Sequence, residues 1–229
     1  IRDRTISYAY LSDTVNVFFV DERKIDADVR AYLKECGVEV APYDSVEKFL
    51  EKIKDATVLL DPNKTSDTIA RSLLNCGTVY AQSPVALLKA VKNDVQIEGT
   101  RKAMERDGVA LVKLFMWIEQ NVASGSITEY DVAQKVQEFR AASPLYRGES
   151  FGLIAGYNEH GAIVHYEPEK ETASTLHPEG MLLVDTGGQY LDGTTDITRT
   201  VALGTPTEAQ RHDYTLVLKG HIALGSMIY

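Results

Sequence analysis

Two aspartates eleven residues apart are the clearest candidates for chemistry in this chain. Asp185 follows the apolar run 181–184 and Asp196 precedes the β-branched run 197–203, so each lies where a predicted strand meets a turn. If the runs form a hairpin centred near Tyr190 and Leu191, the two carboxylates face each other directly, with Cβ atoms roughly 5 Å apart. Carboxylates that close repel each other unless a proton or a cation lies between them. Because hard divalent cations prefer carboxylate oxygen, the pattern favours a metal site.

The register of this hairpin has an alternative. A turn centred on Asp192 and Gly193 displaces Asp185 from Asp196 unless a bulge or a longer loop keeps them facing. The two aspartates could also be solvated groups on a surface hairpin. We favour the metal site, because Asp185 directly follows three large apolar residues and an unpaired charge at the end of a buried strand is costly.

The stretch Asp185–Thr200 resembles the signature of the Xaa-Pro aminopeptidases, a branch of the pita-bread metallopeptidases. Two upstream segments, Gly161–Tyr166 and Ala90–Arg101, match other parts of that family in the same order. The resemblance covers essentially the whole chain and is strongest from Pro84 onward. It implies an enzyme that removes the first residue of peptides with proline at position two. It also implies two divalent metal ions, manganese by analogy, and a cytoplasmic homodimer of the three-domain type.

The resemblance also assigns roles to individual residues. It makes Asp185 a ligand of one metal ion and Asp196 a ligand that bridges both. His165, at the end of a predicted strand over 161–166, would stabilise the reacting carbonyl group of the substrate. Without the resemblance, the simpler interpretation of His165 is a core histidine that is hydrogen-bonded to a backbone carbonyl. Thr198 and Thr200 are weaker candidates for orienting the carboxylates.

The family's metal site needs a further histidine and two glutamates from later strands, and a later glutamate would act as general base. The chain ends at Tyr229 without them. We therefore expect an internal fragment of a longer protein, incomplete at both ends and without peptidase activity on its own.

The residues before these motifs predict two domains of different class, α/β and then α+β. Over residues 1–83, strands alternate with helices, which is typical of a small α/β domain with a largely parallel sheet and matches the family's creatinase-type N-terminal domain. The expected strands are 15–20, 38–41, 57–61 and 78–81, and the expected helices are 26–36, 45–53 and 66–75.

Ser83 and Pro84 mark the expected boundary. Residues 84–229 then predict the first half of a pita-bread catalytic domain. The expected helices are 93–122, one that begins at Thr128, and 207–227, and the expected strands are 151–156, 161–166 and the Asp185 hairpin.

Composition excludes several function classes. The chain has a net charge of −9, with 44% hydrophobic and 25% charged residues, as in soluble globular proteins. An acidic surface repels nucleic acid and anionic lipid, and no apolar stretch has the length of a membrane span. Cys36 and Cys76 have neither a metal-binding spacing nor a disulfide framework, which favours a reducing compartment.

Three other functions compete with the aminopeptidase. Leu182–Gly187 has the apolar-Asp-Thr-Gly pattern of aspartic proteases, but those enzymes are all-β and the pattern does not recur in this helix-containing chain. A prolidase-type dipeptidase would use the same two aspartates. A pita-bread relative without catalytic activity, acting as a binding module, is the third.

Overall fold

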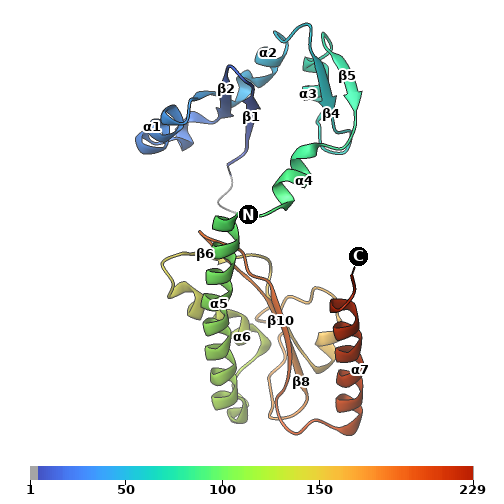
Figure 1. The fold of residues 1–229 in the computed structure, drawn as a ribbon. Helices are drawn as coiled ribbons and strands as arrows, with labels where there is room; N and C mark the ends of the chain where they lie inside the picture. Colours follow the sequence, from blue (N-terminus) through green and yellow to red (C-terminus); the bar gives the residue numbers. More distant parts are fainter. Residues whose placement is uncertain (1–4, 229) are drawn as a thin grey trace. The chain divides into compact units, whose positions relative to one another are not determined.

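The computed structural model describes residues 5–228 and divides the chain into two compact units, one ending at Val91 and the other beginning at Lys92 (Figure 1). Helix α4, Pro84–Ala90, belongs with the first unit. The division therefore falls eight residues after the Ser83–Pro84 boundary that the sequence suggests. Within residues 5–228, no helix combines the length and the apolar character that crossing a bilayer requires.

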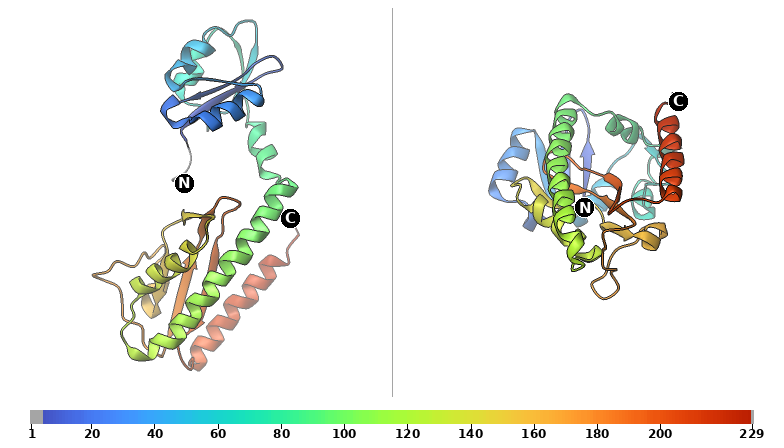
Figure 2. Two further views of the ribbon diagram at one scale, coloured as in Figure 1. Left: turned by 90° about the vertical axis from the view of Figure 1, so that its left-hand side faces the viewer. Right: turned by 90° about the horizontal axis from the view of Figure 1, so that it is seen from below.

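The first unit has the predicted alternation of strands and helices, distributed over two sheets (Figures 1 and 2). In the three-stranded sheet, β2 pairs parallel with β3 and antiparallel with β1, and in the second sheet β4 pairs parallel with β5. The strands are β1 Ser7–Leu11, β2 Asn16–Val20, β3 Val38–Pro42, β4 Thr57–Leu60 and β5 Gly77–Tyr80; the helices are α1 Ala27–Glu35, α2 Val46–Leu50 and α3 Asp67–Ser72, with 3-10 turns η1 Glu22–Lys24 and η2 Tyr43–Ser45. Strand β1 was not predicted.

Two capped helices form the scaffold of the second unit. Helix α5, Asp94–Asn121, begins with a capping box at Asn93, and after the 3-10 turn η3, Val122–Ser124, helix α6, Glu129–Ala141, begins with one at Thr128. Their apolar faces pack together and onto one face of a sheet. The buried residues of this core include Leu111, Leu114 and Ile118 of α5, Val132 and Val136 of α6, and Leu182, Val184 and Ile197 of the sheet.

The sheet of the second unit has the order β10-β8-β7, with both pairings antiparallel. Its strands are β7 Ile154–Tyr157, β8 Met181–Thr186 and β10 Ile197–Ala202, and a separate ribbon pairs β6 Tyr146–Glu149 with β9 Gly188–Tyr190. Side chains alternate along β8: Leu182, Val184 and Thr186 are buried beneath the helices, so Asp185 points to the opposite face.

The predicted strand over 161–166 is wrong. Residues Asn158–Ala162 form a 3-10 helix, η4, and the chain then turns through residues 163–166. This segment is held by side-chain hydrogen bonds: the Tyr166 hydroxyl donates to Glu129 Oε2 over 2.9 Å. A tertiary contact of this kind overrides a local β pattern.

The last helix, α7, Glu208–Gly225, lies on the side of the sheet away from α5 and α6 (Figure 1). None of its described side chains is buried, and Val217 is 74% exposed. The helical spacing of Tyr214, Val217 and His221 in the sequence predicts that they share a buried side of this helix, but the structure leaves all three exposed.

Candidate functional site

The hairpin register brings the two aspartates onto one face of the sheet. Asp185 pairs with Thr198, Thr186 pairs with Ile197, and Gln189 bridges Thr194, so the turn is centred one residue later than predicted. The directly opposed arrangement is therefore wrong. Moving the turn centre by one residue changes each cross-strand partner by two, and because side chains alternate with period two, the two carboxylates stay on the same face.

Asp185 and Asp196 are thus diagonal neighbours across the two strands. In such a pair the Cα atoms lie about 7–8 Å apart, within reach of two carboxylate side chains that converge on a common ligand. Thr198, directly opposite Asp185, donates its hydroxyl to Asp185 Oδ1 over 2.7 Å. Thr200 pairs with Leu183 and lines a different hollow, beside α7, so the structure separates it from the two aspartates.

A cavity of about 290 Å³ joins the two aspartates to His165. The lining residues come from β7, from the segments before β7 and after η4, and from the hairpin; they are Phe151, Gly152, Ile154, His165, Glu167, Asp185 and Asp196. A larger hollow of about 430 Å³ in the first unit is lined by Asp21 and Arg23, which pair with each other. The smaller cavity is the candidate site, because Asp185, Asp196 and His165 all line it.

His165 reaches this cavity from a turn with an unusual backbone. Its φ of +57° lies in the left-handed region, which residues other than glycine seldom adopt. Glu167, two residues later, also lines the cavity and was missed by sequence reasoning. Its carboxylate packs against Gly152, where a Cβ atom would lie 2.0 Å from Glu167 Oε1, so a larger residue at position 152 would displace the Glu167 side chain.

A fully buried carboxylate, Glu129, holds the segment that presents His165. It accepts hydrogen bonds from the backbone N–H groups of Tyr157 and Ser174, over 2.6 and 2.8 Å, and from the Tyr166 hydroxyl. The His160 ring nitrogen Nδ1 lies 3.0 Å from both of its oxygens. From the sequence, His160 in its turn is predicted to be solvated, and nothing local singles out Glu129. Both contacts were missed because they join residues far apart in the chain.

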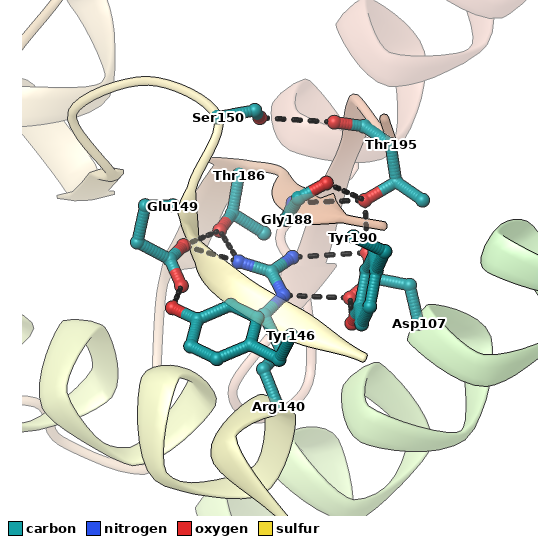
Figure 3. A network of polar contacts seen from close by, with 9 residues as sticks. All are labelled: Asp107, Arg140, Tyr146, Glu149, Ser150, Thr186, Gly188, Tyr190 and Thr195. Carbon is teal, nitrogen blue, oxygen red and sulfur yellow. Dashed lines mark hydrogen bonds and ion pairs between the residues drawn. The ribbon is translucent and has the colours of Figure 1, made fainter. Parts of the chain in front are cut away.

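A second polar network lies behind the hairpin, on its covered face (Figure 3). Arg140 of α6 and Asp107 of α5 form an ion pair with no exposed side-chain surface, and Glu149 of β6 also contacts Arg140. Burial raises the pKa of Glu149, although Arg140 opposes that effect. Burial lowers the pKa of Arg140, but its hydrogen bond to Asp107 and the negative charges of Asp107 and Glu149 outweigh burial and hold that pKa above its usual value.

The hydroxyl groups around this ion pair complete the network. Thr186 accepts from Arg140 over 2.6 Å, and Thr195 and Tyr190 donate to Asp107 over 2.8 and 2.9 Å. Burial raises the pKa of the Tyr190 hydroxyl, and its hydrogen bond to Asp107 adds to the effect.

The donor chemistry of the cavity suits a hard divalent cation, since Asp185 and Asp196 offer carboxylate oxygens on one face. The number of donors is smaller than a closed site requires. Among residues 5–228, no three histidine, cysteine, aspartate or glutamate side chains are close enough together to hold a metal ion. The described residues therefore fit part of a metal site.

Comparisons with known proteins find relatives over nearly the whole chain. Aminopeptidase P2 of Arabidopsis thaliana is 34% identical over 98% of the chain, and Probable Xaa-Pro aminopeptidase P of Arthroderma benhamiae is 40% identical over 97%. The crystal structure of an X-prolyl aminopeptidase from Caenorhabditis elegans, described as a cytosolic enzyme with a di-nuclear active site, superposes with a TM-score of 0.85 at 31% identity over 95% of the chain.

The chain spans about a third of these relatives: 36% and 34% of the two sequences and 37% of the solved structure. The profile of a creatinase/prolidase N-terminal domain matches residues 4–96, and that of metallopeptidase family M24 matches residues 98–228. The predicted fold, a creatinase-type α/β domain followed by part of a pita-bread domain, is confirmed. The chain therefore belongs to the metallopeptidase family M24.

Proposed function

We propose that this chain is part of a metal-dependent aminopeptidase that removes the N-terminal residue from peptides with proline at position two. One observation carries the proposal: Asp185 and Asp196 share a face of the hairpin and line one cavity with His165. The relatives that match nearly the whole chain are named as aminopeptidases P, and these names support the same substrate class.

Asp185 and Asp196 are proposed as ligands of two divalent cations, with manganese as the predicted metal. The di-nuclear site named for the C. elegans enzyme supports the number of metal ions. Bound metal of this kind polarises a scissile carbonyl and lowers the pKa of a water molecule. Thr198 would fix the orientation of Asp185 through its 2.7 Å hydrogen bond. The remaining ligands and the general base would come from the part of the relatives that this chain does not cover.

His165 is proposed to hydrogen-bond the substrate carbonyl oxygen as negative charge develops on it. The left-handed backbone at His165 and the tether from Tyr166 to Glu129 support this role, because they fix the turn that carries the ring. Strain of this sort is typical of functional positions.

Two further properties are proposed. The C. elegans enzyme is called cytosolic, which supports a cytoplasmic location for the protein. A homodimer remains a prediction, and analytical ultracentrifugation of the full-length protein tests it.

The test of the metal site uses the full-length protein that contains this chain. Asp196→Asn should abolish binding of Mn²⁺ and hydrolysis of an Xaa-Pro-Xaa tripeptide, whereas the control Asp67→Asn, at an exposed ion pair in the first unit, should leave both unchanged. Chelation should stop the wild-type reaction and added Mn²⁺ should restore it. Full activity of Asp196→Asn would contradict the proposal. Turnover that continues in the presence of the chelator, as expected of an aspartic protease, would also contradict it.

The same assay separates the related alternatives. A prolidase-type enzyme would cleave only Xaa-Pro dipeptides, and a binding module without catalytic activity would cleave neither substrate. The 229-residue chain alone is predicted to be inactive, because its described residues supply too few ligands. Turnover of an Xaa-Pro peptide by the isolated chain with added Mn²⁺ would contradict that prediction.

A further inference from the structure

The buried ion pair Asp107–Arg140 contacts the two strands at the residues next to the two aspartates. Thr186 follows Asp185 in β8, and Thr195 precedes Asp196 just before β10 begins. Neighbouring residues of a strand point to opposite faces, so each threonine lies on the covered face directly behind an aspartate that faces the cavity. Thr186 and Thr195 are 0% and 1% exposed.

One rigid group therefore holds both threonines (Figure 3). Asp107 binds Arg140 through two hydrogen bonds, of 2.6 and 3.0 Å, and accepts the Thr195 hydroxyl. The other side of the same guanidinium donates to the Thr186 hydroxyl over 2.6 Å. Charge-assisted hydrogen bonds with two donors or acceptors fix geometry more strictly than single neutral ones.

The backbone between the two threonines is fixed as well. The Gly188 N–H donates to Thr195 Oγ1 over 2.8 Å, and the Thr195 N–H donates to the Gly188 carbonyl over 2.9 Å. The Ser150 hydroxyl donates to the Thr195 carbonyl over 3.0 Å. These bonds leave the backbone beside Asp196 little freedom to move toward or away from β8.

We propose that Asp107 and Arg140 are positioning residues that set the separation of Asp185 and Asp196 through Thr195 and Thr186. The inference rests on the proposed function, since the separation matters only if the two carboxylates share metal ions. A metal pair requires its ligands at a defined spacing, and groups that orient ligands change metal affinity about 10–100-fold when they are removed.

The experiment removes one threonine hydroxyl at nearly constant volume in the full-length protein. Thr195→Val deletes the bonds of the hydroxyl to Asp107 and to the Gly188 N–H, and Thr195→Ser keeps both. We expect Thr195→Val to weaken Mn²⁺ binding, measured by calorimetry at 25 °C, by about tenfold or more, and to alter the visible absorption bands of the Co²⁺-loaded protein. Thr195→Ser should restore both toward the wild-type values.

A second variant guards against a folding defect. Thr186→Val removes the contact to Arg140, and it should also weaken Mn²⁺ binding. Because both threonines act through one ion pair, the double variant should lose less affinity than the product of the two single losses. The control Arg106→Gln breaks the partly exposed Arg106–Asp192 pair, one residue from Asp107, and should change neither Mn²⁺ affinity nor the Co²⁺ spectrum.

The outcomes separate this inference from the proposed function. Wild-type protein that binds no Mn²⁺ would overturn both. Wild-type binding together with unchanged affinity and spectra in Thr195→Val and Thr186→Val would overturn the positioning role alone. Lower thermal stability of the metal-free variants, with affinity at 25 °C unchanged, would also overturn it, because it would show a purely structural contribution.

Discussion

Glu129 provides a demanding test of how a buried carboxylate supports this site. Its side chain is 0% exposed and lies in the first turn of α6, where the helix dipole also favours negative charge. Replacing Glu129 with alanine removes the acceptor for two backbone N–H groups, those of Tyr157 and Ser174, and for the Tyr166 hydroxyl. All three donors belong to segments around His165, so both stability and the position of His165 should change.

The expected magnitude follows from the number of lost bonds. A hydrogen bond to a charged group contributes about 1.5–3 kcal/mol, and a buried donor left without an acceptor loses that stabilisation. Two backbone donors therefore give a loss of about 3–6 kcal/mol in the free energy of unfolding. Glu129→Gln keeps one acceptor oxygen and should cost about half as much, since its amide nitrogen must face one of the two backbone N–H groups.

The measurement is urea unfolding of the 229-residue chain, followed by tryptophan fluorescence. Trp117 is the only tryptophan and packs against the core of the second unit, so its emission reports that unit separately from the first. The control is Glu138→Gln, also in α6, whose carboxylate side chain is 66% exposed and pairs with Lys135. It should change stability by less than about 0.5 kcal/mol. A loss below about 1 kcal/mol in Glu129→Ala would refute the reasoning, because unsatisfied buried donors cost more than that.

Two further predictions concern the contact of α5 with the hairpin turn. Gly99→Ala would place a Cβ atom 2.2 Å from the Asp192 carbonyl oxygen and should destabilise the second unit by about 1–3 kcal/mol. Gly108→Ala, whose Cβ atom would have nothing within 4 Å, should stabilise the unit by about 0.5–1 kcal/mol. The opposite order of stabilities in urea unfolding would contradict this packing. The side-chain hydrogen bond from Arg106 holds the pKa of Asp192 below its usual range. The pair therefore stabilises the fold fully at pH values above the unfolded-state pKa of about 4. This stabilisation is lost as the pH falls through the lower pKa of the folded state. Unfolding midpoints should therefore fall more steeply below about pH 4 in the wild type than in Asp192→Asn, and equal slopes would exclude the pair as a contributor.

Periodicity and caps predicted most of the fold, because these signals are local. The apolar run at β2 and the cap at Thr128 need no knowledge of distant residues. Strand β1 was missed because its paired residues are at most half-buried, so its pairing with β2 leaves a weak pattern in the sequence. The turn at residues 163–166 was misjudged because its conformation depends on Glu129, which lies in another helix.

The positions of the two candidate aspartates could be predicted from the sequence, whereas the residues that support them could not. Asp185 and Asp196 adjoin apolar runs, so strand alternation predicts the face of the sheet on which each lies. That prediction holds even though the turn is centred one residue later than expected. Arg140 continues the buried spacing of Val132 and Val136 at intervals of four residues, and a charge at such a position was a signal of a buried pair. Its partner Asp107 could be identified only from the packing of α5 on α6.

The exposure of α7 affects how the isolated chain should behave at the bench. Several large apolar side chains are exposed to water along this helix, among them Leu216, Val217, Ile222 and Leu224. Patches of that kind promote self-association and bind hydrophobic dyes. Preparations of the 229-residue chain should therefore brighten anilinonaphthalene sulfonate, scatter light increasingly with concentration, and keep better with a mild detergent present.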